Sequence, residues 1–191
     1  MNDRLANNKT KNVIFLGSSV TYGSANGGIS FADYLCERNG FSMIKEAVSG
    51  TTLVDKDAQS YVSRLKTIDA SECDVFVCQL STNDASLKLP IEDIEEAIDF
   101  IIDYAKNKWN CVVAFYTNPK YDSAEYSDMV ELIKDKAEKK KIILMNMWDD
   151  KELNKKISEK QEYYMADPIH PNATGYLEIF TPFMEGYGIF N

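Results

Sequence analysis

Short apolar runs alternate with amphipathic segments along the whole chain, and this alternation limits the possible folds more than any other feature. Each run is apolar on both faces of an extended strand, as expected where helices cover both sides of a parallel sheet. We therefore predict a three-layer α/β/α sandwich around a sheet of about five parallel strands. The predicted strands are residues 13–16, 74–80, 111–117 and 142–148, with a weaker one at 43–48.

Amphipathic patterns between these runs predict the helices. The clearest follows Pro90, where apolar residues recur at spacings of three and four and form one stripe. A second helix follows a capping-box pattern from Asp122 to Glu125. A third starts at Ser30 to Asp33 and stops at Gly40. The stripe of the first helix is Ile91, Ile94, Ile98, Ile101, Ile102 and Ala105, and that of the second is Met129, Leu132, Ile133 and Ala137.

Length and charge narrow the domain count and the range of partners. A chain of 191 residues suits one domain, so we expect a flexible segment at residues 1–11 and a single domain at 12–191. The 21 basic and 30 acidic residues give a net charge of -9, which repels phosphate backbones and anionic lipid headgroups. We therefore expect no nucleic-acid and no membrane partner. Because the first residues are polar, we expect a cytoplasmic protein unless a leader has been removed.

The cysteines and the single histidine bear on metals and cofactors. The cysteines form no CxxC pattern and three of them stand in apolar stretches, so we expect buried thiols. A zinc site is hard to build with one histidine, and we expect neither a metal nor a cofactor. The cysteines are Cys36, Cys73, Cys78 and Cys111.

Polar residues follow the first three predicted strands, at the edge where ligands bind in parallel sheets. Ser19 comes at a strand-to-helix turn, which exposes a serine hydroxyl and its backbone N–H. Gly50 follows the weaker strand and lets a backbone N–H approach a ligand closely. The Asn83 amide, after the next strand, can donate a hydrogen bond to an oxyanion. Each of these residues alone also fits ordinary turn or helix-cap chemistry.

The sequence Asp167-Pro168-Ile169-His170-Pro171 near the C-terminus contains the only histidine. Acyl transfer through a serine needs a base that takes the hydroxyl proton and a carboxylate that orients this base. Asp167 and His170 stand three residues apart on a turn stiffened by prolines, so both side chains can face one pocket. A surface histidine in a loop is the simpler alternative.

These residues, in this order, resemble the four sequence blocks of the SGNH, or GDSL-like, hydrolase family. The resemblance extends roughly from Val13 to Gly175 and implies the flavodoxin-like fold of that family. It implies a serine esterase that acts on a small-molecule ester and needs no cofactor. The blocks are Gly17-Ser18-Ser19, Gly50, Thr82-Asn83-Asp84 and the segment from Asp167 to Pro171.

The resemblance also implies a role for each residue. Ser19 is the nucleophile, and His170, oriented by Asp167, is its base. The oxyanion hole consists of the backbone N–H groups of Ser19 and Gly50 and the side chain of Asn83. The substrates implied are short acyl esters, including acetyl groups on carbohydrates.

This chain departs from the family pattern at two positions. Ser18 stands where the family has an acidic residue before the nucleophile, which leaves two adjacent serines as candidates, although Ser19 matches the family's serine. Ser81 stands where the family has glycine. We predict that Ser18 and Ser81 contact the substrate, together with Asn118 and Tyr121 after the fourth strand.

A flavodoxin-like binding module without hydrolase activity is the alternative hypothesis. In that case the loop from Ser18 to Gly28 would hold the phosphate of a flavin nucleotide. This hypothesis leaves Asn83 and His170 without a role, and a yellow colour of the purified protein would favour it. The GxSxG pattern of α/β-hydrolases does not occur in the sequence. The sequence predicts no oligomeric state.

Overall fold

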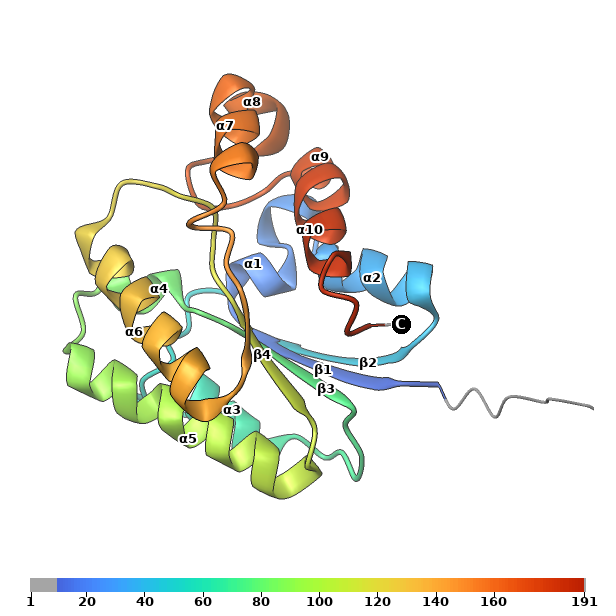
Figure 1. Ribbon diagram of the computed structural model, residues 1–191, viewed down its shortest axis with the longest axis vertical. Helices are drawn as coiled ribbons and strands as arrows, with labels where there is room; N and C mark the ends of the chain where they lie inside the picture. Colours follow the sequence, from blue (N-terminus) through green and yellow to red (C-terminus); the bar gives the residue numbers. More distant parts are fainter. Residues whose placement is uncertain (1–9, 191) are drawn as a thin grey trace, which may run out of the picture.

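Five parallel strands form one sheet in the part of the chain that this computed structural model describes, residues 10–190 (Figure 1). Their order across the sheet is β2-β1-β3-β4-β5. This confirms the predicted α/β fold; most of the predicted flexible segment, residues 1–9, lies outside the described residues. The strands are β1 (Asn12–Gly17), β2 (Ser42–Ala47), β3 (Val75–Gln79), β4 (Val112–Tyr116) and β5 (Ile143–Met145).

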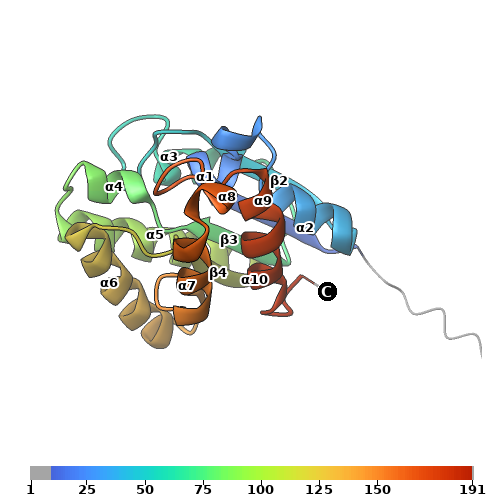
Figure 2. The same cartoon turned by 90° about the horizontal axis from the view of Figure 1, so that it is seen from above.

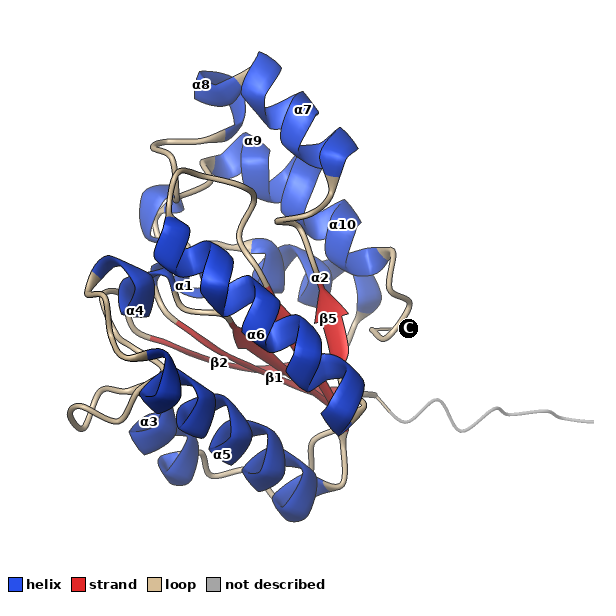
Figure 3. Ribbon diagram, turned by 60° about the vertical axis from the view of Figure 1, so that its left-hand side comes forward, coloured by secondary structure: helices blue, strands red, loops and turns tan. Residues whose placement is uncertain are grey.

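Helices cover both faces of the sheet (Figure 3), as predicted. One face carries α3 (Tyr61–Thr67), α5 (Ile91–Trp109) and α6 (Ala124–Lys140). The other carries α2 (Phe31–Asn39), α7 (Lys151–Glu159), the π-helical segment η2 (Tyr176–Phe180) and α10 (Thr181–Glu185). Figure 2 shows α5 and α6 on one side and α2 and α10 on the other. The short segments are α1 (Ser19–Tyr22), η1 (Ser24–Asn26), α4 (Thr82–Ser86), α8 (Gln161–Tyr164) and α9 (Ala173–Gly175).

Side chains that alternate along the strands divide the core into two clusters. In β1, Ile14 and Leu16 pack with the helices of one face, and Val13 and Phe15 pack with the helices of the other. Successive residues of a strand point to opposite faces, so a strand covered on both sides is apolar at nearly every position. The continuous apolar runs of the sequence follow from this burial. Among the described residues, no helix has both the length and the apolar character needed to cross a membrane.

The strand order places a topological switch point at the carboxyl end of β1. From β1 the chain moves outward to β2 on one side, then crosses to β3 on the other side. The loops after β1 and β3 therefore leave the sheet in different directions, and ligands bind at such switch points. The loops that follow β1, β2 and β3 bear Ser19, Gly50 and Asn83.

Capping side chains set the starts of α2 and α6, whereas α5 starts after a proline and has no side-chain cap. α2 begins with a capping box between Ser30 and Asp33 and ends before Gly40, as predicted. α5 follows Pro90, as predicted. The predicted capping box from Asp122 is wrong, because the side chain of Ser123 accepts the hydrogen bond of the Tyr126 N–H at 3.1 Å and is the N-cap of α6.

The last strand is shorter than predicted and ends at Met145 rather than at residue 148. Beyond it the chain forms a turn in which Asn146 and Asp149 bond to each other. The Asn146 Nδ2 donates to Asp149 Oδ2 at 2.8 Å, and the Asp149 N–H donates to Asn146 Oδ1 at 3.2 Å. These bonds close a turn where the sequence predicted the end of the strand.

The cysteines are free thiols, but only two of them are buried as predicted. Cys73 and Cys78 are buried, whereas Cys36 and Cys111 are half-buried. Cys36 lies on α2 and Cys111 just before β4, at positions that the helices cover only in part. The described residues include no cluster of His, Cys, Asp and Glu side chains suited to a metal ion.

Candidate active site

Ser19 stands in the turn between β1 and α1, which we call the Ser19 turn (residues 17–19). The turn is too tight for a side chain at Gly17, because a Cβ atom there would lie 1.8 Å from Thr21 Oγ1. Ser19 is consequently the first residue of α1, and it is 7% exposed. Its Oγ lies 2.8 Å from His170 Nε2.

Gln79, the last residue of β3, holds the Ser19 turn from below. Its Oε1 accepts hydrogen bonds from the Ser18 N–H and from Thr21 Oγ1, both at 2.9 Å. The Ser18 hydroxyl also points to this oxygen, at 3.4 Å. Ser18 is thus fully buried and faces the protein interior, whereas its neighbour Ser19 faces His170.

Asp167 and His170 lie on a short loop that we call the Asp–His loop (residues 165–171). The His170 Nδ1 bonds to Asp167 Oδ2 at 2.7 Å. The other carboxylate oxygen accepts the backbone N–H groups of Ile169 and His170, each at 2.8 Å. With Nδ1 donating to the carboxylate, Nε2 is free to accept the Ser19 hydroxyl proton.

The electrostatics of the Asp–His loop favour a charged Asp167. Partial burial opposes the charge, but the backbone N–H groups of His170 and Ile169 and the His170 ring outweigh it and lower the pKa of Asp167. An ionised carboxylate on Nδ1 supports the charged imidazolium that forms when the base takes a proton.

Three hydrogen-bond donors lie at the ends of β1, β2 and β3. Gly50 has a φ of +81°, a conformation that favours glycine and turns the backbone sharply. Within residues 10–190, the N–H groups of Ser19 and Gly50 donate to no protein acceptor. The Asn83 Nδ2 donates to the Thr51 carbonyl at 2.8 Å, which uses one of its two N–H bonds. A second N–H of Asn83 remains for an oxyanion.

Asp84, next to Asn83, fixes the loop that bears Gly50. Its carboxylate accepts the backbone N–H of Leu53 at 2.8 Å and that of Val54 at 3.1 Å. Asp84 is fully buried, and this burial raises the pKa of its carboxyl group against the effect of its hydrogen bonds. A buried acid thus connects α4 to the segment that follows β2.

Ser81 is fully buried, like Ser18, and bonds within the chain. It is the N-cap of α4: its Oγ accepts the N–H of Asn83 at 3.2 Å and that of Asp84 at 3.4 Å. The serine that replaces the family's glycine therefore supports the helix start that presents Asn83. That Ser18 and Ser81 contact the substrate stays a prediction.

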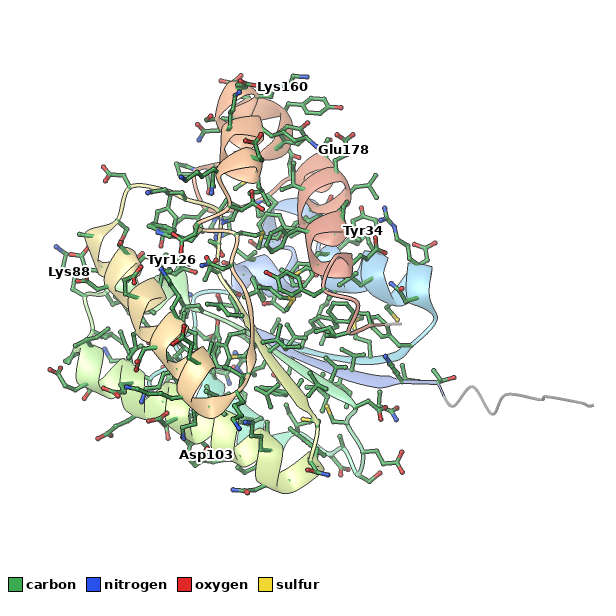
Figure 4. All side chains as sticks on the ribbon, viewed as in Figure 1. Tyr34, Lys88, Asp103, Tyr126, Lys160 and Glu178 are labelled. Carbon is green, nitrogen blue, oxygen red and sulfur yellow. The ribbon has the colours of Figure 1, made fainter. Side chains whose placement is uncertain are left out.

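Asn118 and Tyr121 follow β4, and of the two only Asn118 has a described contact with the Asp–His loop. Asn118 is fully buried, and its Nδ2 donates to the Ile169 carbonyl at 3.1 Å. Its N–H donates at 2.9 Å to the hydroxyl of Tyr126, which lies on α6 (Figure 4). Tyr121 is half-buried, with its ring 5.5 Å from that of Trp148. Their contact with substrate also stays a prediction.

Sequence reasoning missed the groups that support the site. Gln79 stands in the apolar run DVFVCQL, residues 74–80. Apart from Asp74 at its start, Gln79 is the only polar residue of this run. A polar residue on a fully buried strand needs a partner, and this signal was available. Asp84 belongs to the third sequence block. Nothing in the sequence near it indicates its buried bonds to Leu53 and Val54, which are about 30 residues away.

Solved structures with the same fold include several esterases. A member of the lipolytic protein G-D-S-L family from Veillonella parvula superposes with a TM-score of 0.74 at 14% identity, over 93% of this chain and 97% of that one. The psychrotrophic esterase EstA from Pseudoalteromonas sp. has a TM-score of 0.68 at 16% identity, over 92% and 95%. The acetyl xylan esterase AlAXEase has a TM-score of 0.73 at 15% identity, over 92% and 98%. At these identities the likeness shows the fold.

The sequence itself carries the evidence for the family. No curated protein matches the chain in sequence. The profile of the GDSL-like lipase/acylhydrolase family, however, matches residues 15–177, which contain the Ser19 turn, Gly50, Asn83 and the Asp–His loop. This chain therefore belongs to the GDSL-like lipase/acylhydrolase family and is a hydrolase.

Proposed function

We propose that this hydrolase is a serine esterase that cleaves short acyl esters through an acyl-serine intermediate. The observation that carries the proposal is an unbroken chain of hydrogen bonds. It runs from Ser19 Oγ to His170 Nε2 at 2.8 Å and from His170 Nδ1 to Asp167 Oδ2 at 2.7 Å. A serine bonded to an imidazole that is held by a carboxylate is the arrangement that activates serine for acyl transfer.

In the first half of the reaction the Ser19 oxygen attacks the ester carbonyl carbon. His170 takes the hydroxyl proton, and the carbonyl oxygen becomes an oxyanion that the N–H groups of Ser19 and Gly50 and the Asn83 amide stabilise. The tetrahedral intermediate then collapses. The bond to the alcohol oxygen breaks, His170 gives its proton to the leaving alcohol, and the acyl group stays on Ser19.

In the second half a water molecule takes the place of the alcohol. His170 accepts a proton from the water, whose oxygen attacks the acyl carbon and forms a second oxyanion at the same donors. Collapse releases the carboxylic acid, and the proton on His170 returns to Ser19. Asp167 stays ionised throughout, in accord with its lowered pKa.

Two observations support short acyl groups, including acetyl groups on carbohydrates, as the substrates. One solved structure of this fold is named an acetyl xylan esterase. On the carbohydrate side, the exposed side chain of Tyr163 on α8 lines the same surface hollow as Asp167 and offers a flat ring of the kind that sugars stack on.

A panel of p-nitrophenyl esters of increasing acyl length and of acetylated sugars tests this proposal. Wild type should cleave the acetyl esters fastest, and Ser19→Ala should lose the activity. Ser18→Ala is the matched control, and it should keep a substantial part of the activity because Ser18 faces Gln79 and not His170. Equal loss of activity in both serine variants would reject Ser19 as the nucleophile. A preference for long acyl chains would reject short acyl esters as the substrates.

A further inference from the structure

Arg64 of α3 is a buried arginine beneath the loops of the site. The residue is 5% exposed, and all five N–H bonds of its guanidinium have an acceptor. Its Nε donates to the Gln59 carbonyl at 2.8 Å, and its Nη1 donates to the Glu46 carbonyl at 2.9 Å and to Glu46 Oε1 at 3.1 Å. Its Nη2 donates to the Gly17 carbonyl at 2.8 Å and to Thr51 Oγ1 at 3.1 Å.

The two acceptors of Nη2 belong to the two parts of the site that must meet at the substrate. Gly17 is the first residue of the Ser19 turn. Thr51 follows Gly50, and its carbonyl accepts the Asn83 Nδ2 at 2.8 Å. Nη2 of Arg64 therefore connects the backbone of the Ser19 turn to the segment of Gly50 and Thr51. This segment includes one oxyanion donor, Gly50, and bonds to another, Asn83.

We propose that Arg64 is a positioning residue, which fixes the Ser19 turn and the segment of Gly50 and Thr51 relative to each other. It touches none of the reacting atoms and acts through the backbone of Gly17 and the side chain of Thr51. The inference rests on the proposed esterase function, in which the Ser19 oxygen and the oxyanion donors must face the same carbonyl group.

A guanidinium is suited to this position and an ammonium is not. Its donors are held in one plane, so they bond to acceptors on several sides with little loss of side-chain freedom. A lysine has one nitrogen with three N–H bonds and cannot reach the Gly17 carbonyl, Thr51 and Glu46 together. Burying a charge is unfavourable unless the charge is paired and fully hydrogen-bonded. The ion pair of Arg64 with Glu46 at 3.1 Å offsets part of this unfavourable free energy.

The test compares Arg64→Lys with wild type and with Arg38→Lys, in steady-state ester hydrolysis and in the labelling of Ser19 by a fluorophosphonate. Small displacements of reacting groups lower rates strongly, so Arg64→Lys should lower kcat about 10- to 100-fold and leave KM nearly unchanged. Arg38 lies on the surface of α2 and pairs with Glu185 at 3.1 Å, so its variant should match wild type.

A rescue experiment separates positioning from general support of the fold. Arg64→Ala should recover part of its lost kcat on addition of methylguanidinium, whereas methylammonium at the same concentration should have no effect. Recovery with both cations, or with neither in a folded variant, would contradict a role that depends on the forked donors.

Thr51→Val provides a second test if substitutions of Arg64 prevent folding. It keeps the shape of the side chain and removes both the Oγ1 acceptor of Arg64 and the bond that Oγ1 donates to the Val48 carbonyl at 2.7 Å, so kcat should fall at least about three- to tenfold, the effect of one hydrogen bond. A folded Arg64→Lys or Thr51→Val variant with the kcat and the labelling rate of wild type would overturn the inference.

Failure of the proposed function gives a different result. If wild type cleaves no ester of the panel, the esterase proposal fails. The labelling rate of Ser19 still reports the arrangement of the serine and the oxyanion donors, because phosphonylation passes through a similar charged intermediate. A labelling rate that is unchanged by Arg64→Lys overturns the inference in either case.

Discussion

The candidate site consists of two halves that are built differently. The serine half, with Ser19, Gly50 and Asn83, lies at the ends of β1, β2 and β3 and rests on fully or almost fully buried polar side chains, Gln79, Arg64 and Asp84. The base half is the Asp–His loop. There the side chain of Asp167 is 49% exposed and that of His170 is 26% exposed.

The two halves also differ in the range of their bonds. Gln79 and Arg64 reach partners that are 61 and 47 residues away, at Ser18 and Gly17. In the Asp–His loop, Asp167 bonds to residues two and three positions further on, and the Ala166 N–H donates to the His170 carbonyl at 2.8 Å. The serine half therefore depends on the folded core, whereas the base half is held mostly by its own local bonds and by one long-range bond, from Asn118 to the Ile169 carbonyl. Substitutions in the two halves should affect stability and activity in different proportions.

The largest expected effect is on activity alone, in the base half. His170→Ala should lower kcat about 10⁴- to 10⁶-fold, as loss of the base does in serine hydrolases. The free energy of unfolding should change by less than about 1 kcal/mol, because the side chain is partly exposed and bonds to few groups. Ester assays and urea unfolding measure both. A loss of several kcal/mol would show that the base half supports the fold and would break the comparison.

Asn83→Ala should have the next largest effect, in the serine half. Loss of one oxyanion donor typically lowers kcat about 100- to 1,000-fold, and KM should stay nearly unchanged because the bond strengthens only as charge develops. The free energy of unfolding should fall by about 1 kcal/mol, because the Thr51 carbonyl loses the nearer of its two donors and keeps only the Ser81 hydroxyl at 3.4 Å. Asn83→Asp should be at least as damaging to kcat. A folded Asn83→Ala variant with kcat close to that of wild type would mean that Asn83 is only a turn residue.

Gln79→Met tests how far the serine half depends on its buried support. The change keeps the approximate size of the side chain and removes the acceptor of the Ser18 N–H and of Thr21 Oγ1. A buried donor without a partner costs about 1 to 3 kcal/mol, but the change also removes Gln79 Nε2, a buried donor that has no partner among the described residues, so the free energy of unfolding should fall by about 1 kcal/mol and kcat should fall with it. Gln161→Met, on the exposed α8, is the matched control and should change neither. Equal stability of the two variants would contradict the assigned role of Gln79.

The smallest effect distinguishes the two halves by pH. The folded state raises the pKa of Asp84, so the stability contributed by its protonated form is present below an ordinary aspartate pKa of about 3.9 and is lost as the pH rises through the raised value. The folded state lowers the pKa of Asp167, so its contribution is present above about 3.9 and is lost as the pH falls through the lowered value.

Urea unfolding of wild type, Asp84→Asn and Asp167→Asn between about pH 3 and pH 8 measures these contributions. As the pH rises above about 4, the free energy of unfolding of wild type should fall relative to that of Asp84→Asn. As the pH falls below about 4, it should fall relative to that of Asp167→Asn. Slopes of the same sign for both variants would contradict the difference between the two carboxyl groups.

The sequence predicted those features that depend on local pattern. Strands buried on both faces leave continuous apolar runs, so β1 and β3 were predicted close to their bounds. The ends of the parallel strands then predicted that Ser19, Gly50 and Asn83 lie at one edge of the sheet, and the family resemblance implied that Asp167 and His170 join them. The structure brings Ser19 and His170, which are 151 residues apart, to 2.8 Å.

Features that depend on contacts between distant segments were not predicted. Arg64 is one charged residue on a short helix, and nothing near it in the sequence indicates that it bonds to Gly17 and Thr51. Choices between neighbours also failed: Asp122 and Ser123 are both good N-cap residues, and only the bond to the Tyr126 N–H decides between them. The bond to Gln79 accounts for the serine at position 18, where the family has an acidic residue, and the sequence near Ser18 does not indicate this bond.

The most direct test of the central claim, that Ser19 is the nucleophile, is to map the site of reaction with a fluorophosphonate. The probe transfers its phosphonyl group to the activated serine oxygen and releases fluoride, and mass spectrometry of peptides locates the adduct. We predict one adduct per chain, on Ser19, formed in Ser18→Ala and absent in Ser19→Ala and His170→Ala. An adduct on Ser18, or ester hydrolysis by a protein that takes up no probe, would contradict the account.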